Sequence, residues 1–113
     1  MIDLYFGNGV GDYLAVIDIF KALANEHRLL IIHYLKNPTA YFSHETDVDM
    51  TEHGVCVGEI QRVLGLTQST TSHYLTMMTK AGLVTPTRIG KWTYYRRNEA
   101  AIQELRKFID KEI

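Results

Sequence analysis

The polar side chains between Thr67 and Lys80 have the types and the spacing of a DNA-contacting surface. Short hydroxyls, an imidazole and an ammonium recur there at helical intervals: Ser69, Ser72, His73, Thr76 and Lys80. Such groups can approach base edges in a major groove, and no carboxylate among them would repel phosphate. A merely solvated helix face more often carries glutamate and lysine. The pattern therefore predicts contact with double-stranded DNA.

The beginning of this segment has a second feature that suits a nucleic acid. Thr67 is a good N-cap, and a helix that begins after it presents unpaired N–H groups and the positive end of its dipole. Both suit a phosphate, and Gln68 is placed to reach an adenine edge. The predicted DNA contacts in this segment are Gln68, Ser69, Thr70, Ser72, His73 and Thr76.

The distribution of charge also indicates a polyanionic partner. No aspartate or glutamate occurs from Arg62 to Arg97, and six of the 12 basic residues lie in that run. All 13 acidic residues lie outside it, so the net charge of the chain is only −1. A net charge near zero would by itself argue against a polyanionic partner. Because long-range attraction depends on the local field, the segregation of charge argues for one.

Turn residues divide the acid-free run and its surroundings into two helices and a hairpin. The first helix is short, is ended by Gly65 and has the apolar residues Val57, Ile60, Val63 and Leu64. The second runs from Thr67 to about Ala81, with Gly82 just after its end. Its expected buried side consists of Thr71, Tyr74, Leu75 and Met78. Two helices joined by so tight a turn form a helix-turn-helix.

β-branched and aromatic residues predict a hairpin after the second helix. The runs 83–85 and 92–95 flank a turn at residues 88–91, and Pro86 suits an edge strand. One face of the second strand is expected to join the core. Beside the second helix, such a hairpin reaches the minor groove or the phosphate backbone with Arg88, Lys91 and Arg96. The alternative is that these charges only keep an edge hairpin soluble.

Three further helices are predicted from apolar periodicity. The first has one apolar face made of Tyr13, Leu14, Ile17, Phe20 and Leu23. The second begins after the N-cap Asn25 and stops at Asn37 and Pro38. The last carries a narrow apolar seam that suits helix–helix contact: Ala101, Ile102, Leu105, Phe108 and Ile109. Residues 39–54 are expected to form an exposed acidic loop with short extended pieces.

The overall composition restricts the class of protein. The 113 residues make one domain, and no apolar stretch approaches the roughly 20 residues that span a bilayer. The N-terminus lacks the pattern of a signal peptide, so we expect a cytoplasmic protein. Ser69 and His73 have the spacing of a nucleophile and its base, but no carboxylate is near to orient the histidine. We therefore expect no enzyme.

Three segments resemble the ArsR/SmtB family of winged-helix bacterial repressors: FKALANEHRLLIIHYL, VCVGEIQRVLGLTQSTTSHYLTMMTKAGLV and RIGKWTYYR. The resemblance covers roughly residues 18–97. It implies a mainly helical winged helix-turn-helix in the order α-α-α-α-β-β-α, forming a single domain over residues 1–113. Residues 56–82 would be the helix-turn-helix and residues 83–97 the wing.

The resemblance also implies how the protein would work. Residues 1–24 and 98–113 would hold a homodimer together, and the dimer would bind a two-fold symmetric operator, with its two DNA-contacting helices about 34 Å apart. The dimer would repress transcription until an inducer releases it. The alternative from a different class is a winged helix that serves as a protein–protein interaction module.

The residues at the family's known metal-sensing positions depart from the family pattern in this sequence. The family's Cys-x-Cys metal motif is replaced here by Cys56-Val57-Gly58, and residues 98–113 contain no histidine. No cofactor or metal is therefore expected. The weak metal candidates are His44, Asp47, Asp49 and His53, in what is otherwise a solvated loop. Cys56 is either a redox sensor near a helix N-terminus or a buried, unreactive thiol.

Overall fold

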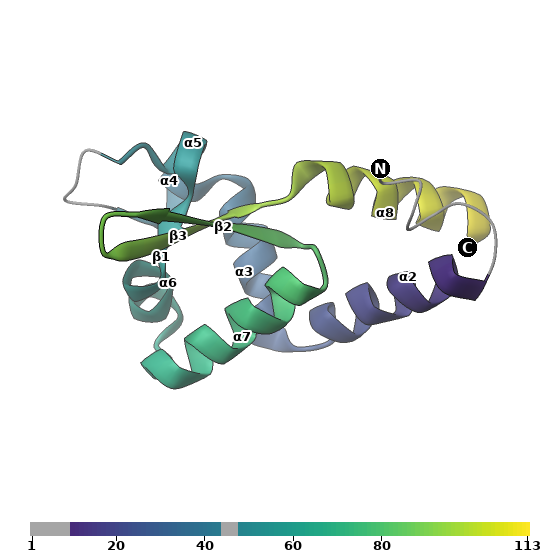
Figure 1. Cartoon of the computed structure of the whole chain (residues 1–113), viewed down its shortest axis with the longest axis horizontal. Helices are drawn as coiled ribbons and strands as arrows, with labels where there is room; N and C mark the ends of the chain where they lie inside the picture. The colour runs from purple at the N-terminus through teal and green to yellow at the C-terminus, as the bar shows by residue number, and fades with distance from the viewer. Residues whose placement is uncertain (1–9, 44–47) are drawn as a thin grey trace.

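Two helices from opposite ends of the chain lie side by side and form one end of the molecule. The structure is a computed structural model that describes residues 10–43 and 48–113. Helix α2 (Val10–Leu23) and helix α8 (Glu99–Glu112) run together at the right of Figure 1. The Tyr13 ring meets the Phe108 ring edge-on, with 5.6 Å between centroids. The Tyr13 hydroxyl donates to Glu112 Oε1 at 2.9 Å, and this hydrogen bond is the main cause of a raised Tyr13 pKa.

The central helix α3 (Glu26–Lys36) begins and ends where the sequence predicts. The Asn25 side chain caps it by accepting a hydrogen bond from the Arg28 N–H at 3.1 Å. Ile31, Ile32 and Leu35 are buried. Because proline fits the first turn of a helix, the short helix α4 (Pro38–Tyr41) starts directly after it.

The predicted loop 39–54 is partly helical, so that prediction was wrong for the described residues. Besides α4, it contains helix α5 (Met50–His53), which is capped by Asp49 through a 2.8 Å hydrogen bond from the Thr51 N–H. Each of these helices is about one turn long. Apolar periodicity cannot reveal a single turn, because it needs two turns to repeat.

The helix-turn-helix has the predicted boundaries. Helix α6 (Val57–Leu64) ends at Gly65, whose φ of 68° is left-handed and permits the tight turn. Helix α7 (Gln68–Lys80) begins after the N-cap Thr67 and is followed by Gly82 at φ 80°. The residues that turn the chain are thus the ones that identified the motif in the sequence.

The hairpin of β2 (Val84–Ile89) and β3 (Trp92–Arg97) is also confirmed, but the sheet has a third strand that was not predicted. Strand β1 (Val55–Cys56) pairs antiparallel with β3, giving the order β1-β3-β2. Pro86 therefore lies on an edge strand, as expected. Neither face of β3 is buried along its whole length: Trp92 and Tyr94 share one face, yet Tyr94 is 2% exposed and Trp92 is 52% exposed.

The core lies between the sheet and helices α3, α6 and α7, and α2 adds Val16, Ile19 and Ala22 to it. The predicted apolar face of α2 is not the side that meets the core, because Tyr13, Leu14, Ile17 and Phe20 on it are exposed. The helix is apolar on nearly every side, so its periodicity does not show which side meets the core. No helix in the described ranges is long and apolar enough to cross a membrane.

Candidate nucleic-acid interface

Helix α7 separates a buried side from an exposed polar side, as its sequence predicts. Thr71, Leu75 and Met78 are fully buried. The opposite side exposes Gln68, Ser69, His73, Thr76 and Lys80, with Ser72 and Thr70 half-buried. The helix forms the lower edge of the molecule in Figure 1, and its N-terminus points toward the same end as the hairpin tip.

The outward polar groups of α7 are available to a ligand. In the part of the chain that the structure describes, the side chains of Gln68, Ser72 and Thr76 make no hydrogen bond to protein, and the backbone N–H groups of Gln68 and Ser69 have no acceptor. These two N–H groups lie at the positive end of the helix dipole, where an anion is favoured.

The other hydroxyls of α7 are hydrogen-bonded within the helix and its cap. Thr71 donates to the Thr67 carbonyl at 2.8 Å, and Thr79 donates to the Leu75 carbonyl at 2.7 Å. Thr67 Oγ1 accepts from the Thr70 N–H at 3.2 Å and lies 3.0 Å from Thr70 Oγ1, so Thr70 belongs to the cap as well as to the predicted contacts. Satisfying the inner hydroxyls lets a helix rich in serine and threonine persist while the outer ones stay accessible.

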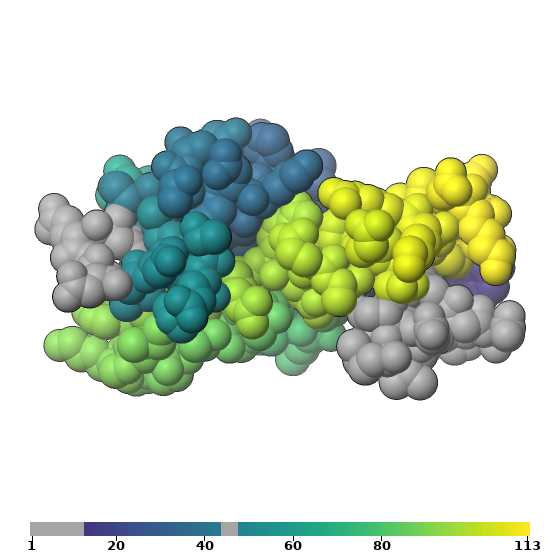
Figure 2. All heavy atoms as spheres, turned by 90° about the horizontal axis from the view of Figure 1, so that it is seen from above, coloured from purple at the N-terminus to yellow at the C-terminus, as the bar shows by residue number. Residues whose placement is uncertain are grey.

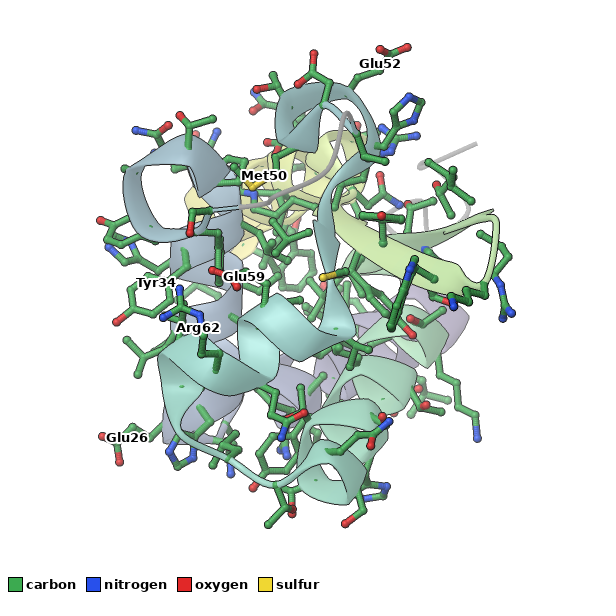
Figure 3. The ribbon with its side chains drawn as sticks, turned by 90° about the vertical axis from the view of Figure 1, so that its left-hand side faces the viewer. Glu26, Tyr34, Met50, Glu52, Glu59 and Arg62 are labelled. Atoms are coloured by element: carbon green, nitrogen blue, oxygen red, sulfur yellow. The ribbon has the colours of Figure 1, made fainter. Side chains whose placement is uncertain are left out.

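The two ends of the acid-free run are paired with acids just outside it. Arg62 and Glu59 form an ion pair, with 3.0 Å from Arg62 Nε to Glu59 Oε2, and Figure 3 shows the two side chains together on α6. Arg97 is buried and pairs with Glu99 at 2.8 Å. In the described ranges no carboxylate pairs with the other four bases of the run, namely Lys80, Arg88, Lys91 and Arg96.

Arg88 and Lys91 occupy the hairpin tip, and both are exposed. The Arg88 Nε donates to the Gly90 carbonyl at 2.9 Å, which fixes the base of the side chain across the turn. The Lys91 Nζ lies 5.7 Å from the centroid of the exposed Trp92 ring. Arg96 lies away from the hairpin tip. It lines a hollow of about 300 Å³ together with Lys36 and Thr51.

The candidate sensor residues are not gathered into one site. Cys56 is half-buried, pairs with Tyr94 in the sheet and stands at the N-cap of α6 without a side-chain capping bond. Asp49 caps α5, and His53 Nε2 lies 3.6 Å from Glu52 Oε2. His44 and Asp47 lie outside the described residues. Within the described ranges no three of His, Cys, Asp and Glu are grouped to hold a metal ion.

A cluster of side chains behind the polar side of α7 was not predicted from the sequence. The His27 ring stacks on the Tyr74 ring at 6.3 Å, and the Arg28 guanidinium lies 5.1 Å from the Tyr74 centroid. The signal was present in the sequence, because Arg28 is a charged residue at the start of an apolar helix. A single such residue does not reveal its partner, which lies on another helix.

Comparison with known proteins identifies the family of this chain. Residues 52–85 match the model of the arsR family of bacterial regulatory proteins. The HTH-type transcriptional regulator YbzH of Bacillus subtilis is 50% identical over 97 residues, which cover 86% of this chain and 97% of that protein. The cadmium resistance transcriptional regulatory protein CadC of Listeria innocua is 33% identical over 74% of this chain and 59% of its own length.

Solved structures show the same fold. An ArsR-like transcriptional regulator from Rhodococcus sp. RHA1 aligns with a TM-score of 0.68 at 20% identity, over 90% of this chain and 82% of its own. The homodimeric winged helix-turn-helix DNA-binding domain of Mb0332 from Mycobacterium bovis aligns with a TM-score of 0.63 at 24% identity, over 92% and 86%. The chain belongs to the arsR family of bacterial regulatory proteins, and it is a DNA-binding transcriptional regulator, not an enzyme.

Proposed function

We propose that two copies of this chain bind a two-fold symmetric operator and repress transcription. Helix α7 enters the major groove with Gln68, Ser69, Ser72, His73 and Thr76, and Thr70 contributes at its capped start. The observation that carries this proposal is the outward side of α7, which is largely exposed and free of acids, and on which Gln68, Ser72 and Thr76 make no side-chain hydrogen bond to the described residues. Small donors of this kind suit base edges, and the N–H groups at the start of α7 suit a phosphate.

The hairpin supplies contacts to the DNA backbone. Arg88 and Lys91 at its tip would bind phosphates or enter the minor groove, and Arg96 would bind a phosphate farther along the duplex. The Arg88–Gly90 hydrogen bond supports this role, because a side chain that is already ordered loses less entropy on binding. Since these are charge contacts, they would add affinity for any DNA sequence.

The homodimer is supported by an apolar surface that a single chain leaves uncovered. Leu14 is 57% exposed and Ile17 is 44% exposed on α2, and Ile109 is 42% exposed on the neighbouring α8. Such a patch on a small domain favours association with a second copy. Two copies joined through α2 and α8 would present their α7 helices to half-sites about 34 Å apart. The homodimeric Mycobacterium bovis domain has the same fold.

Release by an inducer completes the proposal, with Cys56 as the candidate sensor residue. It lies at the junction of β1 and α6, the first helix of the helix-turn-helix. A chemical change at its thiol would therefore act next to the DNA-binding unit. The protein–protein alternative has no comparable support, because the matching relatives are transcriptional regulators.

His73→Ala and Lys91→Ala test the separate roles of α7 and the hairpin. We expect His73→Ala to reduce the preference for operator over random DNA by about tenfold, because a base contact is lost. Lys91→Ala should weaken binding to both DNAs about equally. Fluorescence anisotropy with the two duplexes at one salt concentration measures both effects. If His73→Ala leaves the preference unchanged, α7 is not oriented in the groove as proposed.

A further inference from the structure

A buried arginine on α3 connects the end of α2 with the DNA-contacting helix α7. Arg28 is only 8% exposed. Its Nε donates to the Ala22 carbonyl at 2.6 Å, and its Nη2 donates to the Lys21 carbonyl at 3.3 Å. Its guanidinium carbon lies 5.1 Å from the centroid of the Tyr74 ring. This one side chain of α3 therefore contacts both α2 and α7.

On the α2 side, Arg28 closes the last turn of the helix. Lys21 and Ala22 stand in that turn, where carbonyl groups lack partners within the helix and the dipole is negative. A guanidinium satisfies both requirements, since it carries a positive charge and several donors in fixed directions. Hydrogen bonds of this charged kind are stronger than neutral ones. The end of α2 is thus fixed to α3 by a directional contact.

On the α7 side, Arg28 holds the ring that stands next to the predicted base contacts. Tyr74 is half-buried, with Arg28 and His27 against its ring. It directly follows Ser72 and His73 in the chain, and the His73 ring lies 6.3 Å from the Tyr74 ring. Because α7 is a rigid unit, a shift of the Tyr74 ring would turn the whole helix about its axis. The neighbouring polar side chains would then point in a different direction.

Direct packing between α2 and α7 is incomplete. An open surface hollow of about 240 Å³ lies along part of the contact between the two helices, and it is lined by Asp18, Lys21, Ala22, Met77, Lys80 and Ala81. Close packing is what normally fixes the angle between two helices. Where packing is missing, a side chain that contacts both elements carries more of that constraint.

We propose that Arg28 is a positioning residue that fixes the angle between α2 and α7, and thereby sets the half-site spacing that the dimer accepts. This inference rests on the proposed function, in which α2 joins the two copies and α7 enters the groove. In such a dimer the angle within each copy determines the distance between the two α7 helices. A looser angle would leave binding to one half-site intact but would relax the requirement for a set spacing.

The test compares spacing selectivity in four variants of the full chain. A binding sequence is first selected from random duplexes with the wild-type protein. Affinity is then measured for three duplexes: the selected site, the same site with five base pairs inserted between its halves, and a single half-site. The variants are Arg28→Lys, which loses the planar donors, Tyr74→Leu, which loses the ring, and Tyr74→Phe, which keeps it. The control is Lys36→Arg, which keeps the charge at an exposed position of α3.

We expect Arg28→Lys and Tyr74→Leu to lower the ratio between the selected and the inserted site by about tenfold, with half-site affinity changed by less than about threefold. Tyr74→Phe and Lys36→Arg should retain the wild-type ratio. An unchanged ratio in Arg28→Lys would overturn the proposal, and Tyr74→Leu decides the question if Arg28→Lys does not fold. An equal loss on all three duplexes would also overturn it, since that is the result of a purely structural role.

A failure of the proposed function would look different. The wild-type protein would then select no sequence, or would bind the selected and the inserted site equally well, before any variant is compared. The wild-type measurements therefore test the operator and the dimer, and the ratio between variants tests Arg28.

Discussion

Replacing Ile17 with glutamate should turn the protein into a monomer and lower its affinity for the operator by about 100-fold or more. Ile17 lies on the side of α2 that faces away from the core, and it is 44% exposed. A dimer that covers this side would bury the new carboxylate without a partner, which is strongly unfavourable. Loss of the dimer removes the gain in affinity that comes from linking two half-site contacts.

Two measurements test Ile17→Glu. The molar mass of the protein in solution shows whether it is a monomer, and a DNA titration measures its affinity for the operator. Thr39→Glu is the matched control, because it places the same charge on the exposed helix α4, away from α2 and α8. The control should remain a dimer with wild-type affinity. An Ile17→Glu protein that is still dimeric would show that α2 does not contribute to the interface.

Replacing Gly54 with alanine should destabilise the fold by about 3 kcal/mol or more. Gly54 has a φ of 99°, in the region that residues with a Cβ rarely adopt. A Cβ at this position would lie only 2.2 Å from the Tyr95 backbone oxygen. The neighbouring atoms are backbone atoms of β3, so the strand itself would have to move.

Urea unfolding followed by circular dichroism measures the stability of Gly54→Ala. Gly58→Ala is the control on helix α6, because an added Cβ meets no atom within 4 Å there. Alanine is a better helix former than glycine, so Gly58→Ala should be neutral or stabilising by up to about 1 kcal/mol. Equal stability of Gly54→Ala and the wild type would mean that β1 and β3 are not packed as described.

The sequence predicted the helix-turn-helix and the hairpin because local residues determine both. Thr67 caps α7 through its own side chain, and Gly65 and Gly82 have the positive φ values that end the two helices. These effects act within a few residues, so they are visible in the sequence. The exposed side of α7 follows from the same local pattern.

Other features depend on partners that are distant in the sequence. Strand β1 has only two residues, and it is a strand because Cys56 faces Tyr94 on β3. For a related reason, the acid-free run offers less positive charge to DNA than its sequence suggests. Arg97 is buried against Glu99 and the Ile32 carbonyl. The buried side of α2 could not be chosen from its pattern, because a nearly uniform apolar helix offers two sides.

The proposed DNA-contacting surface and the sensor candidates differ in how the chain positions them. The surface is one continuous helix side with a basic hairpin tip, and its residues lie on elements with strong local signals. The sensor candidates are spread over β1, α5 and residues outside the described ranges. Cys56 remains the candidate that stands nearest to the helix-turn-helix in the chain.

The measurement that tests the central claim most directly is a salt titration of binding between the purified protein and a selected operator duplex. Arg88, Lys91 and Arg96 from each copy would neutralise about six phosphates, so the logarithm of the binding constant should fall with the logarithm of salt concentration at a slope of about −5. Lys91→Ala should make this slope about 2 less steep, one for each copy. Binding that does not change with salt, or no binding to any duplex, would contradict the account.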